Sequence, residues 1–106
     1  MVDFTQARQN MVDCQLRTNK IVNDALINAF LTVPRECFVE KGHESIAYVD
    51  KDVSVGLGRH LIAPMVLAQL MQSLEAKPDE VALDVGCATG YSSAILAHLV
   101  MTVVAL

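Results

Sequence analysis

The sequence predicts an α/β fold in which helices precede a strand–helix–strand unit. Residues 81–85 (Val-Ala-Leu-Asp-Val) form a short apolar run that reads as a buried strand. A glycine-containing turn follows at once, and residues 91–99 after it are expected to be helical. Residues 102–106 (Thr-Val-Val-Ala-Leu) then indicate a second buried strand. Two such strands joined by a helix are typical of a parallel sheet.

Two helices are expected before Pro34. Asp3 and Gln6 resemble a capping box, which predicts a first helix over residues 4–18. Its apolar residues recur at helical spacing at Phe4, Ala7, Met11 and Cys14. Asn23 is a suitable N-cap for a second helix, which should end before the proline. The apolar face of that second helix would carry Leu26, Phe30 and Val33.

Residues 35–62 are expected to be irregular, with Cys37-Phe38-Val39 as a possible short strand and glycines marking the loops. Pro64 suits the first turn of a third helix. One continuous apolar stripe is expected along it, formed by Leu67, Leu70, Met71 and Leu74. The turn Lys77-Pro78-Asp79-Glu80 would end this helical segment.

The chain has 106 residues, enough for one small domain with a modest core. Its net charge of −4 offers no basic surface for nucleic acid. The longest weakly polar stretch, residues 94–106, is shorter than the roughly 20 residues of a membrane span, and no signal peptide is expected. The three cysteines are odd in number and widely spaced, which predicts a reducing cytoplasm and neither a disulfide framework nor a zinc site.

The sequence stops inside the second strand of the unit. A strand–helix–strand unit covers a parallel sheet only when further strands and helices follow. We therefore expect the N-terminal part of a larger α/β protein, with a complete miniature domain as the alternative.

The turn between the two strands is the candidate functional site. Asp84 lies two positions before Gly86, and Gly90 follows four positions later. Glycine removes the Cβ that would keep a ligand from backbone N–H groups at a helix N-terminus. Aspartate at the carboxyl end of a buried parallel strand is costly to desolvate without a partner, and ligands bind outside that edge. The alternative is a plain strand-to-helix turn with a charged strand end.

This spacing matches neither the dinucleotide fingerprint nor a Walker loop. It resembles motif I of the S-adenosylmethionine (SAM)-dependent methyltransferases, with Ala88 in place of the middle glycine. Alanine is harmless there at negative φ and costly at positive φ. Asp84 would face the ammonium group of SAM directly or through water. Cys87 has no basic neighbour to activate it and is expected to be a small packing residue.

Four segments together resemble the protein-L-isoaspartate O-methyltransferases, and they cover most of the chain. Residues 33–39 (Val-Pro-Arg-Glu-Cys-Phe-Val) are similar to the family's Val-Pro-Arg-x-x-Phe-Val. Residues 47–50 (Ala-Tyr-Val-Asp) resemble its Ala-Tyr-x-Asp. Residues 58–64 (Gly-Arg-His-Leu-Ile-Ala-Pro) occupy the place of Gly-Gln-Thr-Ile-Ser-x-Pro, and motif I follows at the expected distance.

The resemblance implies a SAM-dependent methyltransferase with a Rossmann-like fold. Residues 1–62 would be its N-terminal helical and loop segment, and residues 63–106 the start of the SAM-binding domain. The implied reaction transfers a methyl group from SAM to a carboxylate of damaged protein that bears isoaspartyl residues. Cofactor contacts are implied for Asp84, Gly86, Cys87, Gly90, Tyr91, Leu61 and Ile62.

The substrate loop departs from the family pattern. Ile62 stands where the family has its active-site serine, so no catalytic residue is assigned. Arg59 and His60 replace the Gln-Thr pair; they could bind a substrate carboxylate, or could be two solvated loop residues. The alternatives to isoaspartyl methylation are a methyltransferase with another acceptor and a non-catalytic SAM-binding or interaction module. No metal is expected.

Overall fold

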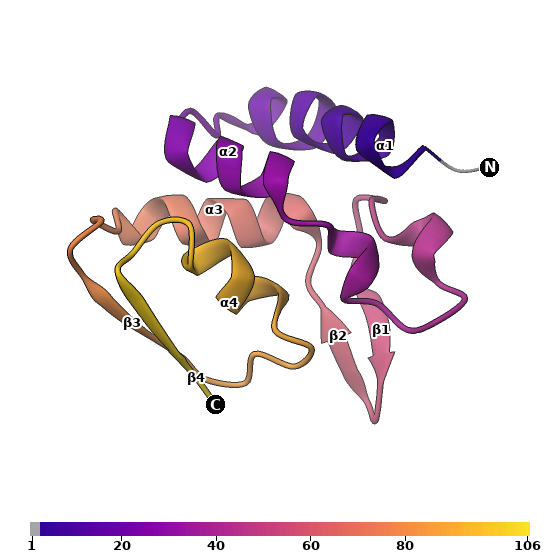
Figure 1. Ribbon diagram of the computed structural model, residues 1–106. Coiled ribbons are helices and arrows are strands. Elements are labelled where there is room, and N and C mark those ends of the chain that lie inside the picture. The colour runs from indigo at the N-terminus through magenta and orange to yellow at the C-terminus, as the bar shows by residue number, and fades with distance from the viewer. Residues whose placement is uncertain (1–2) are drawn as a thin grey trace.

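The computed structural model describes residues 3–106 (Figure 1). Its first helical segment is continuous but changes its turn type twice. It comprises α1 (Phe4–Met11), a π-helical turn η1 (Val12–Leu16) and a 3₁₀ turn η2 (Arg17–Asn19). The Asp3 carboxylate accepts a hydrogen bond from the Gln6 N–H at 3.1 Å. The Gln6 side chain donates to Asn10, so half of the expected capping box forms and the helix itself is confirmed.

The second expected helix is α2 (Asp24–Thr32). The Asn23 side chain accepts a hydrogen bond from the Leu26 N–H at 3.1 Å, as an N-cap does. Val33 is extended, with φ −77° and ψ 123°. This is the conformation to which a following proline restricts a residue, so the helix ends where the sequence predicts.

The strand considered for Cys37-Phe38-Val39 is wrong. Residues Arg35–Cys37 form the 3₁₀ turn η3, in which the Cys37 N–H donates to the Pro34 carbonyl at 2.9 Å. The Phe38 N–H donates to the Arg35 carbonyl at 3.0 Å. These local bonds use the backbone donors that a strand would need for its neighbour. Another 3₁₀ turn, η4, follows at Glu44–Ile46.

An antiparallel hairpin occupies the end of the segment expected to be irregular. It pairs β1 (Val53–Gly56) with β2 (Arg59–Leu61). The two connecting residues have positive φ, 55° at Leu57 and 72° at Gly58, as in the type I′ turns that suit twisted hairpins. The signal for this hairpin was the pair of closely spaced glycines beside alternating valines.

The third helix, α3 (Pro64–Leu74), begins with proline at its first position, as predicted. Its apolar stripe is narrower than expected. Leu67, Ala68 and Met71 are buried, whereas Leu70 and Leu74 are 56% and 62% exposed. The Gln72 side chain fastens α3 to the start of α2, because its oxygen accepts the Val22 and Asn23 N–H groups. Turn residues 77–80 follow, with the Glu80 N–H donating to the Lys77 carbonyl at 3.1 Å.

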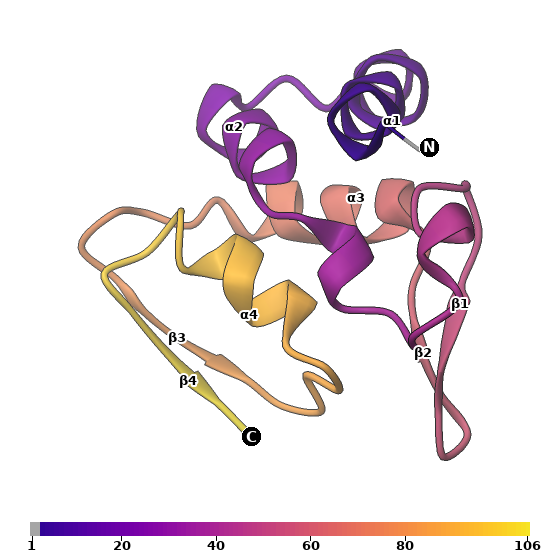
Figure 2. The same cartoon turned by 45° about the vertical axis from the view of Figure 1, so that its right-hand side comes forward.

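The predicted strand–helix–strand unit is confirmed. It consists of β3 (Val81–Asp84), α4 (Tyr91–Leu96) and β4 (Thr102–Ala105). The strands are parallel, in a register that runs from Val81↔Thr102 to Asp84↔Ala105. Helix α4 lies between α2 and this strand pair (Figures 1 and 2).

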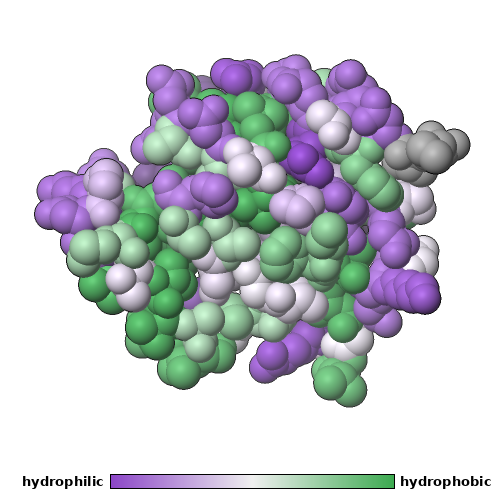
Figure 3. Space-filling model, in the orientation of Figure 1, coloured by the Kyte–Doolittle hydropathy of each residue, from purple (hydrophilic) through white to green (hydrophobic). Residues whose placement is uncertain are grey.

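The two strands are less buried than predicted, because α4 covers one face of the pair. Ala82 and Val103 pack against the core. The other face exposes large apolar side chains at Val81, Leu83, Val85, Val104 and Leu106. Figure 3 shows hydrophobic residues gathered over this strand pair and mostly hydrophilic ones over α1 and α2.

One hydrophobic cluster runs from the N-terminal helices to α4. At its centre the ring of Tyr91 packs against Phe30 and Phe38, with centroid separations of 6.2 Å and 5.5 Å. Residues on both sides of position 62 contribute to this cluster; the division of the chain into 1–62 and 63–106 stays a prediction. Within residues 3–106, no helix is both long and apolar enough to cross a membrane.

Candidate functional site

A cleft of about 480 Å³ lies beside the glycine turn. The β2–α3 connection contributes His60, Leu61 and Ile62 to its lining. The turn and the start of α4 contribute Asp84, Gly86, Cys87, Ala88, Tyr91 and Ser92. Helix α3 and β3 supply apolar side chains, Leu67 and Leu83 among them. The structure thus brings two segments predicted from separate motifs to one cleft of the size that small ligands occupy.

Two predicted site residues lie elsewhere. Arg59 is exposed on β2, outside the residues that line the cleft, whereas its neighbour His60 lines it. Gly90 is the N-cap of α4 with φ 96°, and its N–H donates to the Cys87 carbonyl at 2.8 Å. Its part in the site is to shape the turn.

The Asp84 carboxylate is held by two hydroxyl groups at the start of α4. Ser92 and Ser93 both donate to Asp84 Oδ2, at 2.6 Å and 2.7 Å. Sequence reasoning missed both serines. Their signal was a pair of hydroxyl residues in the first turn of the helix that follows an acidic strand end. A carboxylate has about four acceptor positions, so Asp84 retains capacity for a ligand in the cleft.

The backbone of the turn is partly engaged within the protein. The N–H groups of Gly86 and Cys87 both donate to the Leu106 carbonyl, at 3.0 Å and 3.4 Å. The Leu106 N–H in turn donates to the Asp84 carbonyl at 2.9 Å, which continues the parallel ladder beyond β4. These two N–H groups are therefore engaged within the protein, and the approach of a ligand to the N–H groups at the start of α4 stays a prediction.

Ala88 adopts the left-handed conformation, with φ 51°. This conformation costs a residue with a side chain roughly 1–2 kcal/mol, because its Cβ crowds the following carbonyl oxygen. Position 88 therefore has the positive φ at which alanine is costly. Gly86 has φ 74°, and a Cβ built on it would find no atom within 4 Å, so the space beside it is open.

Tyr91 forms part of the cleft wall and is almost wholly buried. Burial raises the pKa of its hydroxyl, a shift that the nearby Arg35 guanidinium only partly opposes. The side chain is therefore neutral at physiological pH. It serves as an apolar support between the core and the cleft.

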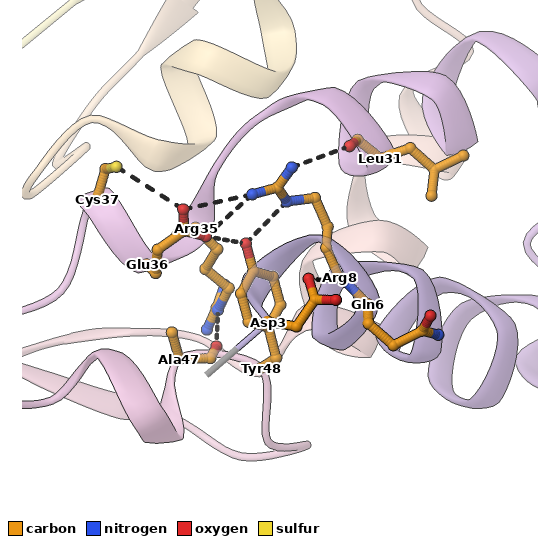
Figure 4. A network of polar contacts seen from close by, with 9 residues as sticks. All are labelled: Asp3, Gln6, Arg8, Leu31, Arg35, Glu36, Cys37, Ala47 and Tyr48. Atoms are coloured by element: carbon orange, nitrogen blue, oxygen red, sulfur yellow. Dashed lines mark hydrogen bonds and ion pairs between the residues drawn. The ribbon is translucent and has the colours of Figure 1, made fainter. Parts of the chain in front are cut away.

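A polar network ties α1 to η3 and to Tyr48, two residues after η4 (Figure 4). Arg8 Nη2 donates to both Glu36 oxygens at 3.1 Å and 3.3 Å, and Arg8 Nε donates to the Tyr48 hydroxyl at 2.9 Å. The Tyr48 hydroxyl donates to Glu36. Burial favours the neutral form of Glu36, but hydrogen bonds from Tyr48 and Arg8 outweigh it and lower the pKa of this carboxyl. The network anchors the N-terminal helices outside the cleft.

No group of three His, Cys, Asp or Glu side chains in residues 3–106 is placed to hold a metal ion. The polar side chains that line the cleft supply one carboxylate, one imidazole, one thiol and the hydroxyl groups of serine and tyrosine, and its other walls are apolar.

Comparison with known proteins gives a consistent result. A family model described as protein-L-isoaspartate(D-aspartate) O-methyltransferase matches residues 6–106. The chain is 35% identical over 102 residues to the protein-L-isoaspartate O-methyltransferase of Petrotoga mobilis, covering 96% of this chain and 48% of that protein. It is 37% identical over 101 residues to the Herpetosiphon aurantiacus enzyme, covering 95% of this chain and 45% of the relative. The chain therefore spans about half the length of these relatives.

Solved structures agree with this. A Plasmodium falciparum chain, described as a protein-L-isoaspartate O-methyltransferase in complex with S-adenosyl-L-homocysteine, superposes with a TM-score of 0.69 at 25% identity. That alignment covers 92% of this chain and 42% of the other. A second protein-L-isoaspartate O-methyltransferase shares the fold with a TM-score of 0.74 at 23% identity, over 92% of this chain and 33% of that one. The chain belongs to the protein-L-isoaspartate(D-aspartate) O-methyltransferase family.

Proposed function

We propose that the cleft beside the glycine turn binds SAM and that the protein transfers its methyl group to the carboxylate of an isoaspartyl residue in damaged protein. The observation that carries the proposal is the convergence of Asp84 and Ile62 on one cleft. In the family pattern these positions belong to the cofactor motif and to the substrate loop. Asp84 and the glycine turn would hold the cofactor, and the His60–Ile62 segment would face the acceptor.

The residues present fit SAM. Its methionyl ammonium group and its sulfonium are both positive, and Asp84 supplies a carboxylate that faces the cleft with acceptor capacity remaining. The apolar walls at Leu61 and Leu67 suit the uncharged parts of the molecule. The open space beside Gly86 leaves room for a ligand close to the backbone.

When bound, SAM supplies an electrophilic methyl group on its sulfonium. The acceptor carboxylate is already ionised at neutral pH, so the chain need not provide a strong base. What its residues contribute is alignment and the exclusion of water from the cleft. His60 is a contact for the acceptor carboxylate, because its side chain lines the same cleft as Asp84. Arg59, exposed on the hairpin, contributes positive charge to the approach.

The partner is a protein or peptide and not a nucleic acid, which the net charge of −4 supports. The three free cysteines, two of them exposed, support a reducing cytoplasm. A methyltransferase with another acceptor is the second candidate. It is favoured by Ile62, whose apolar side chain stands at the cleft where the family pattern has a hydroxyl.

Calorimetric titration with SAM and with S-adenosylhomocysteine tests the cofactor site. Asp84→Ala should weaken binding of both ligands by about tenfold to a hundredfold, as expected for a lost charged hydrogen bond. Gly86→Val should also weaken it, because valine is strained at positive φ and fills the open space beside the turn. Asp79→Ala, an exposed aspartate at the other end of β3, is the matched control. Unchanged affinity in both turn variants would contradict the assignment.

The substrate is tested separately, by transfer of a radiolabelled methyl group. An isoaspartyl peptide should accept the methyl group, and the isomeric aspartyl peptide should not. A protein that binds SAM but methylates neither peptide would favour the second candidate, or a non-catalytic SAM-binding module.

A further inference from the structure

The peptide group between Ile62 and Ala63 is held at both ends by side chains from other segments. Its carbonyl oxygen accepts a hydrogen bond from Arg35 Nη2 at 2.9 Å. Its N–H donates to Asp52 Oδ1 at 2.8 Å. Arg35 is the first residue of η3, and Asp52 directly precedes β1. Three segments distant in sequence therefore meet at one peptide group.

This peptide lies between two regular elements and belongs to neither. Strand β2 ends at Leu61 and α3 begins at Pro64. The proline restricts Ala63 to an extended conformation, observed at φ −51° and ψ 140°. No hydrogen bond of a sheet or a helix fixes the plane of the Ile62–Ala63 peptide. The side chains of Arg35 and Asp52 therefore determine its orientation. The two bonds also fix the position of the backbone at Ile62, whose side chain lines the cleft.

Arg35 connects the same peptide to a second part of the cleft wall. Its guanidinium carbon lies 4.9 Å from the ring centroid of Tyr91, the first residue of α4 after the glycine turn. Its Nε also donates to the Ala47 carbonyl at 2.6 Å. One rigid, planar group thus contacts the backbone at Ile62 and the ring of Tyr91. A lysine could not reproduce this fork of donors.

Burying the Arg35 side chain in the core is energetically unfavourable compared with burying an apolar side chain. Its side chain is fully buried, and among residues 3–106 no carboxylate forms an ion pair with it and its Nη1 has no hydrogen-bond partner. Burial lowers the pKa of the guanidinium, and the nearby Tyr91 and Asp52 side chains oppose this only in part. A buried charge without an ion-pair partner adds little to stability compared with an apolar side chain of similar volume. Its directional contacts are what an apolar side chain would lack.

We propose that Arg35 and Asp52 are positioning residues, which orient the Ile62–Ala63 peptide and so hold the Ile62 wall of the cleft in register with the glycine turn. Neither side chain lines the cleft itself. The consequence for cofactor binding rests on the proposed function. The orientation of the peptide does not, and it can be measured without a ligand.

Variants of Asp52 separate positioning from folding, because this side chain is exposed and its loss leaves the core intact. Asp52→Ala removes the acceptor for the Ala63 N–H, whereas Asp52→Asn keeps an oxygen in its place. Arg35→Lys keeps the charge and loses the fork. Matched controls are Asp13→Ala and Arg17→Lys, the same substitutions in an exposed ion pair on the first helical segment.

The first measurement is NMR on the ligand-free chain. Asp52→Ala should accelerate hydrogen exchange of the Ala63 amide by about tenfold, the loss expected for one hydrogen bond. It should also shift and broaden the Ile62 δ-methyl signal, since the backbone at Ile62 loses an anchor and becomes free to move. Asp52→Asn should restore both signals toward wild type, and the two control variants should leave them unchanged. An unchanged Ala63 amide and Ile62 methyl in Asp52→Ala would overturn the proposal.

The second measurement is S-adenosylhomocysteine affinity, taken well below the melting temperature. Asp52→Ala and Arg35→Lys should each weaken it by about fivefold to tenfold. Because both act on one peptide group, the double variant should lose less than the product of the two effects. Lower melting temperatures with unchanged affinity would reduce both residues to structural ones and overturn the positioning role. If the wild-type chain does not bind, the proposed function fails, and the NMR measurement still decides the orientation of the peptide.

Discussion

A hydrogen bond of 2.6 Å joins the Ser92 hydroxyl to the Asp84 carboxylate and closes the glycine turn from the side of α4. The two residues lie at the end of a strand and at the start of the next helix, so the bond fixes one element against the other. Ser93 makes the same contact at 2.7 Å. The carboxylate expected to meet a cationic ligand is therefore pre-oriented by the helix that follows it.

Removal of both hydroxyls should weaken cofactor binding. In Ser92→Ala/Ser93→Ala, Asp84 stays charged but loses its orientation, so S-adenosylhomocysteine affinity should fall about fivefold to thirtyfold, less than for Asp84→Ala. Calorimetry on the double variant and on each single variant measures it. Ser45→Ala, an exposed serine in η4 outside the lining of the cleft, is the control. An affinity equal to wild type in the double variant would show that the serines only pack the turn.

Ala88→Gly should stabilise the protein. The native φ of 51° is strained for alanine and free for glycine. The gain of roughly 1 kcal/mol from relieved strain is reduced by the greater entropy of glycine in the unfolded chain. Urea unfolding of the variant should therefore show a higher midpoint at an unchanged slope. Ala97→Gly, an alanine with φ −61° after α4, should lower the midpoint instead.

The Arg8–Glu36–Tyr48 network should make stability depend on pH. The pKa of Glu36 is lowered in the folded state, because the Tyr48 and Arg8 hydrogen bonds outweigh the effect of burial. A lowered folded pKa means that the stabilisation is fully present above the unfolded value of 4.5 and is lost as the pH falls through the folded pKa.

Glu36→Gln should therefore reduce stability at neutral pH and flatten its decline between neutral pH and about pH 3. Glu75→Gln, at an exposed helix end, serves as the control. Unfolding free energies of the three proteins, measured by urea denaturation across this range, decide the matter. Parallel pH profiles for wild type and Glu36→Gln would show that Glu36 does not contribute to the acid sensitivity.

Ile62→Ser should raise the rate of isoaspartyl methylation. The substitution places a hydroxyl at the cleft position where the family pattern has serine. A hydrogen bond to a charged group is worth roughly 1.5–3 kcal/mol, so a gain of about one to two orders of magnitude is the most to expect. Radiolabelled transfer to an isoaspartyl peptide measures it, with Ile62→Val as an apolar control. Robust transfer by the unmodified protein would show that Ile62 is tolerated in this reaction.

The sequence by itself determined the order and type of most elements. Asn23 and Pro34 mark the two ends of α2, and Pro64 marks the start of α3. These ends are predictable because N-capping and the conformational restrictions of proline act on the backbone within a few residues. The apolar runs on either side of the glycine turn were enough to predict the parallel unit of β3 and β4. Residues 33–39 were one of four segments that together indicated the family, but their sequence did not reveal their own conformation, which local 3₁₀ bonds decide.

Only the tertiary structure decided which side chains meet. Leu70 and Leu74 share the spacing of Leu67 and Met71, yet they are exposed, because burial depends on what packs opposite and not on the period alone. The Ser92 contact with Asp84, and the hold of Arg35 and Asp52 on the Ile62–Ala63 peptide, join residues from different elements. Such contacts exist once the chain has closed its loops around a common core, and no local pattern specifies them.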